Sequence, residues 1–201
     1  MARMDAVRSA GRMLSTLGAL SLDRVRARWQ DFPVRVADLT PEWLSGVLAT
    51  RYAGTHVQAF EILDEHSGTT SRARLSLQYK DRGEGDDAPS TVFLKLTPAA
   101  LPQRVFVSIT GIGHNEVRFY HSARTSVPVR APSVHGLQSL GCGRYFVLVL
   151  EDITAPGTRL TTVGDRASLQ DAEQVVRALA SLHAAFWESP RFRTDLSWLP
   201  N

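Results

Sequence analysis

Three short segments carry groups suited to a phosphorylated ligand. In His66-Ser-Gly-Thr-Thr-Ser71 a glycine and small hydroxyl residues allow backbone N–H groups and hydroxyls to approach phosphate oxygens. Lys95 stands inside the apolar run Thr91-Val-Phe-Leu-Lys-Leu96, where an inward-facing ammonium needs an anionic partner. Glu116 follows in a predicted helix. Phosphoryl transfer from ATP uses such a set: a loop over the phosphates, a lysine on them and a glutamate that holds the lysine.

Each segment also has an ordinary structural explanation. One glycine among threonines and serines is typical of a tight turn. The stem of Lys95 could carry its ammonium to the edge of the sheet. Glutamate in a first helical turn is favourable with the helix dipole alone. The order of the three segments, more than any one of them, favours a nucleotide site.

The use of lysine draws attention to Lys95. Of the 23 basic residues 21 are arginine, and only Lys80 and Lys95 are lysine. Arginine and lysine differ in shape, hydration and pKa behaviour, so a lysine among so many arginines can mark a site that arginine would not fill. Lys80 stands beside Asp81 and Arg82 at a predicted strand end, where we expect it in solvent.

The strands that must position these residues follow from alternation. Residues 72–79 place apolar side chains on one face and polar ones on the other, and residues 57–63 form a more ragged strand. Residues 80–90 are a polar connector, which predicts a hairpin with the strand at 91–96. Residues 134–137 predict a short strand. The apolar run at 144–150 predicts a strand buried on both faces, which ends at Glu151-Asp152.

Helices are predicted from caps and from spacing. Thr40-Pro41-Glu42 opens one helix, Asn115 caps another that runs to about Arg124, and Ser168 with Asp171 forms a capping box. Gly111-Ile-Gly113 is interpreted as a flexible link rather than a dinucleotide loop. Residues 1–30 are arginine-rich, with apolar residues at helical spacing. Both a membrane-surface or targeting helix and a terminal helix packed on the domain fit this pattern, and we favour the second. The helix after Ser168 carries one apolar stripe: Ala172, Val175, Val176, Leu179, Leu182 and Phe186.

In this order the segments resemble the aminoglycoside phosphotransferase and choline kinase-like enzymes, and bacterial members most. The matching stretches lie between about residue 36 and the end: Leu39-Thr-Pro-Glu-Trp-Leu44, Ser67-Gly-Thr-Thr-Ser71, Val92-Phe-Leu-Lys-Leu96, Asn115-Glu-Val-Arg-Phe-Tyr120, Tyr145-Phe-Val-Leu-Val-Leu-Glu-Asp-Ile153 and Leu179-Ala-Ser-Leu-His-Ala-Ala-Phe-Trp187. The resemblance implies an α+β fold: a protein-kinase-like N-lobe with an antiparallel sheet and an αC-type helix, then a hinge and the first helix of an incomplete C-lobe. The implied domains are a helical extension at 1–35, the N-lobe at 36–152, and the hinge and start of the C-lobe at 153–201.

The resemblance also implies roles for individual residues. The loop over the phosphates would be Ser67, Gly68, Thr69, Thr70 and Ser71. Lys95 would bind the α- and β-phosphates of ATP, with Glu116 as its anchor. Leu150 would back the adenine pocket. The carbonyl of Glu151 and the amide of Ile153 would make the hinge hydrogen bonds.

The family's catalytic His-Gly-Asp stretch, its asparagine and its later metal-binding aspartate have no match in these 201 residues. The sole His-Gly pair is His135-Gly136, and Leu137 follows it. We therefore name no catalytic or metal residue, and expect Mg²⁺ only in a full-length protein. We expect this chain alone not to transfer phosphate. Two hypotheses remain: the ATP-binding lobe of a small-molecule phosphotransferase with an unknown acceptor, and a non-catalytic nucleotide-binding or scaffold module.

Composition narrows the other possibilities. The formal charge of +3 and scattered acids do not favour nucleic acid as a partner. No apolar run is long enough for a membrane span. The single cysteine, Cys142, suits a reducing compartment, so a cytoplasmic location is expected. No histidine spacing predicts a zinc site. We also expect self-association through the helix at 168–189, whose apolar stripe lacks a cover.

Overall fold

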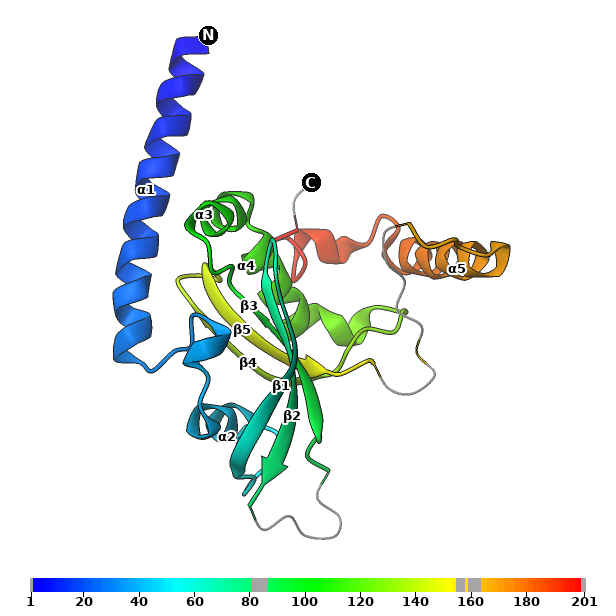
Figure 1. Cartoon of the computed structure of the whole chain (residues 1–201). Coiled ribbons are helices and arrows are strands. Elements are labelled where there is room, and N and C mark those ends of the chain that lie inside the picture. The colour runs from blue at the N-terminus through cyan, green and yellow to red at the C-terminus, as the bar shows by residue number, and fades with distance from the viewer. Residues whose placement is uncertain (1, 81–86, 155–157, 159–163, 200–201) are drawn as a thin grey trace. The chain divides into compact units, whose positions relative to one another are not determined.

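The protein folds into an α+β structure with one antiparallel sheet and several helices (Figure 1). This computed structural model describes residues 2–80, 87–154, 158 and 164–199, and side chains from Met13 onward. Its longer elements are α1 (Ala2–Trp29), α2 (Pro41–Ala49), β1 (Val57–Ser67), β2 (Ser71–Tyr79), β3 (Thr91–Leu96), α3 (Leu101–Thr110), α4 (Ile112–Arg118), β4 (Val134–Leu140), β5 (Tyr145–Glu151) and α5 (Leu169–Phe186). Short 3-10 turns cover Val36–Asp38, Arg124–Ser126 and Pro190–Arg193, and a π-helical turn covers Phe119–Ala123.

The chain divides into two compact units. The sheet unit comprises Met1–Val117 and Ser133–Asp152. The helical unit comprises Arg118–Pro132 and Ile153–Asn201. All five strands belong to the sheet unit, and α5 belongs to the helical unit.

The sheet has the strand order β1-β2-β3-β5-β4, and every neighbouring pair is antiparallel. The predicted hairpin between β2 and β3 is confirmed, with Arg72 opposite Lys95 and Arg74 opposite Phe93. Residues 81–86 of its connector lie outside the described residues. β1 runs four residues beyond the predicted strand and has register shifts at Val57/Ala59 and Ile62/Asp64, which accounts for its ragged pattern.

One face of the sheet forms the hydrophobic core. The alternation predicted for residues 72–79 is confirmed, because Ala73, Leu75 and Leu77 are buried on this face. Leu44, Val47 and Leu48 of α2 pack in the same core. α2 begins as predicted, with the Thr40 hydroxyl accepting a hydrogen bond from Trp43 N–H at 3.1 Å. The prediction that β5 is buried on both faces is confirmed from Tyr145 to Leu150.

The helices between β3 and β4 differ from the sequence prediction. A helix that the sequence patterns did not indicate, α3, runs from Leu101 to Thr110 and ends at Gly111 with φ +71°. The next helix begins at Ile112, so Asn115 lies inside it, and the prediction of a cap at Asn115 was wrong. α4 ends at Arg118 and passes into the π-helical turn, rather than continuing as one helix to Arg124. Gly111 and Gly113 are therefore a helix terminus and a helical residue, not a flexible link.

The C-terminal half of α1 packs on the sheet unit, as the favoured interpretation predicted. Leu20 and Ala27 are buried in the core. Asp23 is also buried, and its Oδ2 accepts a hydrogen bond from Arg144 Nε at 2.7 Å. Gly141 lies against Asp23 with φ +59°, and a Cβ there would meet Asp23 Oδ2 at 1.9 Å. Only glycine fits this turn, because both its backbone conformation and its space exclude a side chain.

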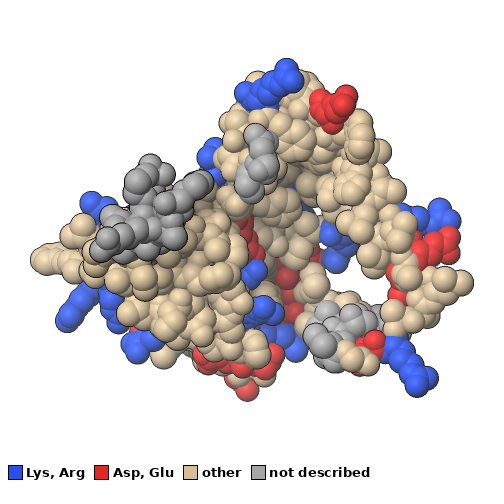
Figure 2. Space-filling model, turned by 90° about the horizontal axis from the view of Figure 1, so that it is seen from above, with Lys and Arg blue, Asp and Glu red and all other residues tan. Residues whose placement is uncertain are grey.

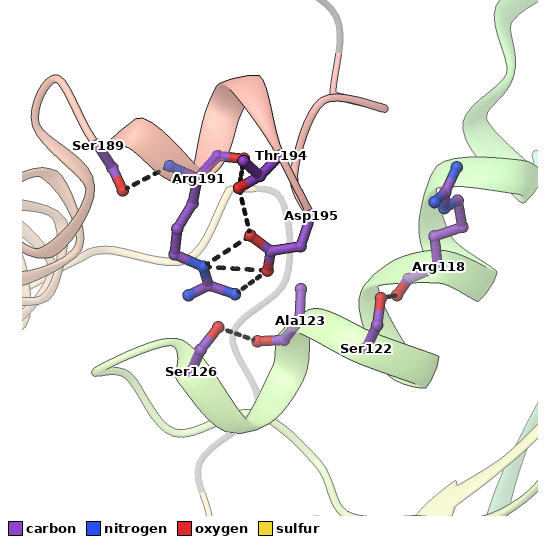
Figure 3. Close-up of polar contacts among 8 residues, drawn as sticks. All are labelled: Arg118, Ser122, Ala123, Ser126, Ser189, Arg191, Thr194 and Asp195. Carbon is purple, nitrogen blue, oxygen red and sulfur yellow. Dashed lines mark hydrogen bonds and ion pairs between the residues drawn. The ribbon is translucent and has the colours of Figure 1, made fainter.

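The helical unit has a polar network at its C-terminal segment (Figure 3). Arg191 Nη2 and Asp195 Oδ2 are 2.6 Å apart, and Ser189 accepts a hydrogen bond from the Arg191 backbone N–H. In the π-helical and 3-10 turns the Ser126 hydroxyl donates to the Ala123 carbonyl at 2.7 Å. The capping box predicted at Ser168 and Asp171 is confirmed at the start of α5. Residues 155–157 and 159–163 of the predicted loop lie outside the described residues.

Charge and hydropathy give two further findings. On the face shown in Figure 2, basic and acidic side chains are interspersed, so the positive charge does not form one field there. Within residues 2–80, 87–154 and 164–199, no helix is both long and apolar enough to cross a membrane.

Candidate functional site

The structure brings Lys95 and Glu116 together. Lys95 Nζ donates a hydrogen bond to Glu116 Oε1 at 2.5 Å. The Lys95 side chain is 25% exposed and that of Glu116 16% exposed. A strand lysine and a helix glutamate, 21 residues apart in sequence, thus form a charge-assisted pair that is largely buried but keeps part of its surface accessible to a ligand.

Gly113 explains how α4 comes near enough for this contact. A Cβ at Gly113 would lie 2.8 Å from the Gly143 carbonyl oxygen and 2.8 Å from Cε1 of Phe146. The absent side chain lets the first turn of α4 pack directly on the β4–β5 turn and on β5. Glu116 follows Gly113 by three residues, about one helical turn. The close approach at Gly113 therefore sets the position from which Glu116 meets Lys95.

The small-residue segment forms the turn between β1 and β2. Ser67 pairs with Ser71 across the hairpin, and Gly68, Thr69 and Thr70 make the turn. The Gly68 N–H donates to the Thr70 carbonyl at 3.1 Å. Ser71 is the register partner of Leu96, the residue after Lys95. Two adjacent strands therefore hold the turn and Lys95 in the same part of the sheet.

Register also places Leu150 on the face of the sheet that carries Lys95. Side chains directly opposite in an antiparallel pair share a face. Arg72 is opposite Lys95, Arg74 is opposite Phe93, and Phe93 is opposite Leu150. This site face thus combines cationic residues on β2 and β3 with the apolar surface of Phe93 and buried Leu150.

An ion pair between Arg74 and Asp152 was missed by sequence reasoning. Arg74 Nε and Asp152 Oδ2 are 2.7 Å apart, and the Asp152 side chain is only 4% exposed. The alternating pattern left two interpretations of Arg72 and Arg74 open, a positive field beside the turn and a solvated strand face, and favoured the second. The pair with buried Asp152 contradicts that interpretation for Arg74. The available signal was an aspartate directly after an apolar strand, with arginines on an alternating neighbour.

Glu151 and Ile153 lie at the end of β5. The Glu151 backbone N–H donates to the Ser133 carbonyl at 2.8 Å, and Ser133 N–H donates to Glu151 Oε2 at 3.0 Å. Ile153 follows β5 as the first residue of this segment of the helical unit. The structure therefore places Glu151 in the sheet, at the opposite end of β5 from Tyr145.

A second polar cluster in the sheet unit surrounds His135. Its Nδ1 and the Tyr52 hydroxyl are 2.7 Å apart, and Arg51 Nη1 donates to the Val134 carbonyl at 2.6 Å. Burial lowers the pKa of His135, the charge of Arg51 lowers it further, and Glu151 opposes both. His135 is thus held toward its neutral form, in a contact that joins the turn after α2 to β4.

No group of three or more histidine, cysteine, aspartate or glutamate side chains is arranged to hold a metal ion within the described part of the chain. Cys142 is exposed in the β4–β5 turn with φ +55°. His114 Nδ1 lies 3.0 Å from the Cys142 carbonyl, a contact made by the backbone rather than by the thiol.

Comparison with protein-family models, with curated proteins and with solved structures gives no match. A function for this chain is therefore inferred from its own residues and their geometry.

Proposed function

We propose that this chain is the ATP-binding lobe of a small-molecule phosphotransferase with a protein-kinase-like N-lobe. The observation that carries the proposal is the Lys95–Glu116 pair beside the Ser67–Ser71 turn. The ammonium would bind the α- and β-phosphates while Glu116 holds its position, and the turn would cover the phosphates with N–H groups and hydroxyls.

Two features of the site face support an adenine nucleotide. Phe93 gives partly exposed apolar surface on the face of Lys95, which suits a base, and buried Leu150 lies opposite Phe93 in β5. Backbone groups of Glu151 and Ile153, at the end of β5, would pair with the edge of adenine. The negatively charged phosphates of ATP would be attracted to this face, which carries the cationic side chains of Arg72 and Lys95.

The scarcity of lysine allows a direct test. An acyl-phosphate derivative of ATP transfers its acyl group to a nearby amine, which forms an amide and releases ATP. Lys95 and Lys80 are the sole lysines of the chain, and Lys80 is exposed beyond the end of β2. We expect mass spectrometry to find the label on Lys95 and not on Lys80, and excess ATP to prevent it.

Matched variants complete the test. Lys95→Met should lose measurable ATP binding, and Lys80→Met should bind as the unchanged chain does. Equal labelling of both lysines, or labelling that ATP does not reduce, would refute the proposal.

A non-catalytic nucleotide-binding module is the second candidate. The sole His-Gly pair of the chain lies in β4, where His135 contacts Tyr52 rather than a candidate acceptor site. This candidate predicts ATP binding that depends little on magnesium, with no phosphate transfer to a panel of alcohols and amines. Turnover that Lys95→Met abolishes would exclude it.

A further inference from the structure

The outer face of α1 carries apolar side chains that the sheet unit does not cover. Leu14 is 70% exposed, Leu22 65% and Trp29 84%, and Val25 is exposed beside them. These residues recur at three- and four-residue intervals with exposed Gly18 between them, so they share one face of the helix. Met4, Val7 and Gly11 continue the same spacing in sequence, although the side chains of Met4 and Val7 lie outside the described part.

The opposite face of α1 fixes its orientation. Leu20 and Ala27 are buried, and the Leu20 carbonyl accepts a hydrogen bond from the Tyr145 hydroxyl at 3.2 Å. Asp23 pairs with Arg144 from the β4–β5 turn. Because these contacts hold the inner face, the apolar outer face stays turned away from the core. A single helix therefore carries two apolar stripes, of which only one has a partner in the described structure.

The charge of the N-terminal segment indicates which kind of partner the outer face of α1 binds. Residues 1–35 contain seven arginines and three aspartates, so this segment alone carries more positive charge than the net +3 of the whole chain. Asp23 is buried and paired with Arg144, whereas Arg24, Arg26 and Arg28 are exposed along the last turns of α1. Arg26 Nη1 also lies 3.6 Å from Asp23 Oδ1, but its side chain is 68% exposed. Arg24 and Arg28 border a cleft that Asp31 and Glu42 also line. Helical spacing places Arg26 on the other flank of the stripe.

Like charges disfavour a second copy of this helix, since its arginines would face arginines. An anionic lipid surface satisfies both features, because arginines bind its headgroups while leucine, valine and tryptophan enter the headgroup boundary. We propose that the outer face of α1 binds an anionic membrane surface, with Trp29 at headgroup depth. Binding of this kind needs no spanning helix.

The test uses the whole chain and sedimented vesicles. Vesicles of phosphatidylcholine mixed with phosphatidylglycerol should bind the chain, and vesicles of phosphatidylcholine alone should bind at least tenfold less. Added salt should weaken the binding. The double variant Leu22→Glu with Val25→Glu should reduce binding at least tenfold, and Arg26→Gln should reduce it about fivefold.

Two controls keep the result specific. Leu169→Glu changes a leucine on α5 that is exposed at least as much as Leu22, and this variant should bind vesicles normally. Brominated lipids should quench the chain's fluorescence, and Trp29→Phe should remove that quenching; circular dichroism checks that each variant is folded.

Absence of binding to anionic vesicles would overturn the proposal and would leave an acidic protein as the favoured class of partner. Equal binding to neutral vesicles, or normal binding by the double glutamate variant, would overturn it too. So would a dimer in sedimentation velocity that the double variant dissociates, because a second copy would then cover the face.

Discussion

The two compact units differ in how far the described apolar side chains are buried in a core. In the sheet unit, apolar side chains fill a core, and the charges of the candidate site are paired, as in Lys95–Glu116. In the helical unit, Val175, Val176 and Leu179 of α5 are exposed. An apolar cavity of about 480 Å³ lies in the same unit, lined by Phe119, Leu182, Phe186, Trp187 and Trp198 among others.

The two units also differ in how their polar side chains are held. Strand register fixes the polar groups of the sheet unit relative to one another, so their chemistry can be argued from geometry. In the helical unit most of the side chains that line the cavity are apolar, with His183 and Glu188 among them, so it is better explained as a packing surface than as a site of chemistry.

The largest effect is expected for Gly113→Ala. Alanine favours a helix by up to about 1 kcal/mol, but its Cβ would meet the Gly143 carbonyl and the Phe146 ring at 2.8 Å. We expect overpacking to dominate and to lower the free energy of unfolding by about 2 kcal/mol. Urea denaturation followed by circular dichroism measures the change.

Gly46→Ala is the matched control for that substitution. Gly46 lies in α2 of the same unit, and a Cβ there has no neighbour within 4 Å. We expect a stabilisation of about 0.5–1 kcal/mol, the ordinary gain in helix propensity. If Gly113→Ala and Gly46→Ala both raised stability, or both lowered it, the close approach at Gly113 would not position α4.

The ion pairs of the two units give the second test. In the sheet unit, a double-mutant cycle of Lys95→Met and Glu116→Gln should give a coupling free energy of about 1.5 kcal/mol, because both groups are largely buried and hydrogen-bonded. In the helical unit, Glu173 Oε1 and Arg177 Nη2 on α5 are 2.6 Å apart, but their side chains are 57% and 77% exposed. The same cycle there should give only about 0.3–0.5 kcal/mol.

Equal coupling in the two cycles would remove the contrast between the units. It would show that the Lys95–Glu116 contact is an ordinary surface pair, which the proposed function does not allow.

The sheet was predictable because its signals are local. Alternation along residues 72–79 follows directly from the pleat of β2, and the apolar run at 144–150 reflects burial on both faces of β5. Lys95 in a predicted strand is followed by Glu116 in a predicted helix, and this order indicated that the two side chains could form a pair. Their pairing depends on a contact between Gly113 and Phe146, which no local pattern contains.

The helices between β3 and β4 were not predictable for a physical reason. The N-cap of α3 is Ala100, which makes no side-chain hydrogen bond to the first turn, so the usual signal for a helix start is absent. Asn115 is a residue that often caps helices, and that preference led to a start four residues away from Gly111, where α3 ends. The Arg74–Asp152 pair is likewise a tertiary contact, between residues 78 apart in sequence.

A change of pH is expected to have a smaller effect on the free energy of unfolding, through protonation of His135 in the sheet unit. Burial, reinforced by Arg51, lowers the pKa of His135 below its ordinary value of 6.5. The unfolded chain therefore binds this proton more readily, so the associated stability is present above pH 6.5 and is lost as pH falls from there through the folded pKa. The slope from one such group is at most about 1.4 kcal/mol per pH unit.

Thermal unfolding between pH 7.5 and 5.5 checks this prediction. His135→Gln should remove part of the loss of stability that the unchanged chain shows over this range. A variant that loses stability as steeply as the unchanged chain would show that other groups carry the pH dependence.

The smallest effect on stability, within about 0.5 kcal/mol, is expected for Leu179→Gln on α5, because this side chain is already 49% exposed. We still expect the substitution to change behaviour in solution. If α5 mediates self-association, analytical ultracentrifugation at rising concentration should show larger species for the unchanged chain and fewer for the variant, and binding of an apolar-surface dye should fall.

The Leu22→Glu and Val25→Glu variant in α1 is the control, since it changes apolar surface in the other unit. A chain that stays monomeric at high concentration and binds no dye would show that the exposed stripe of α5 has no partner in a second copy.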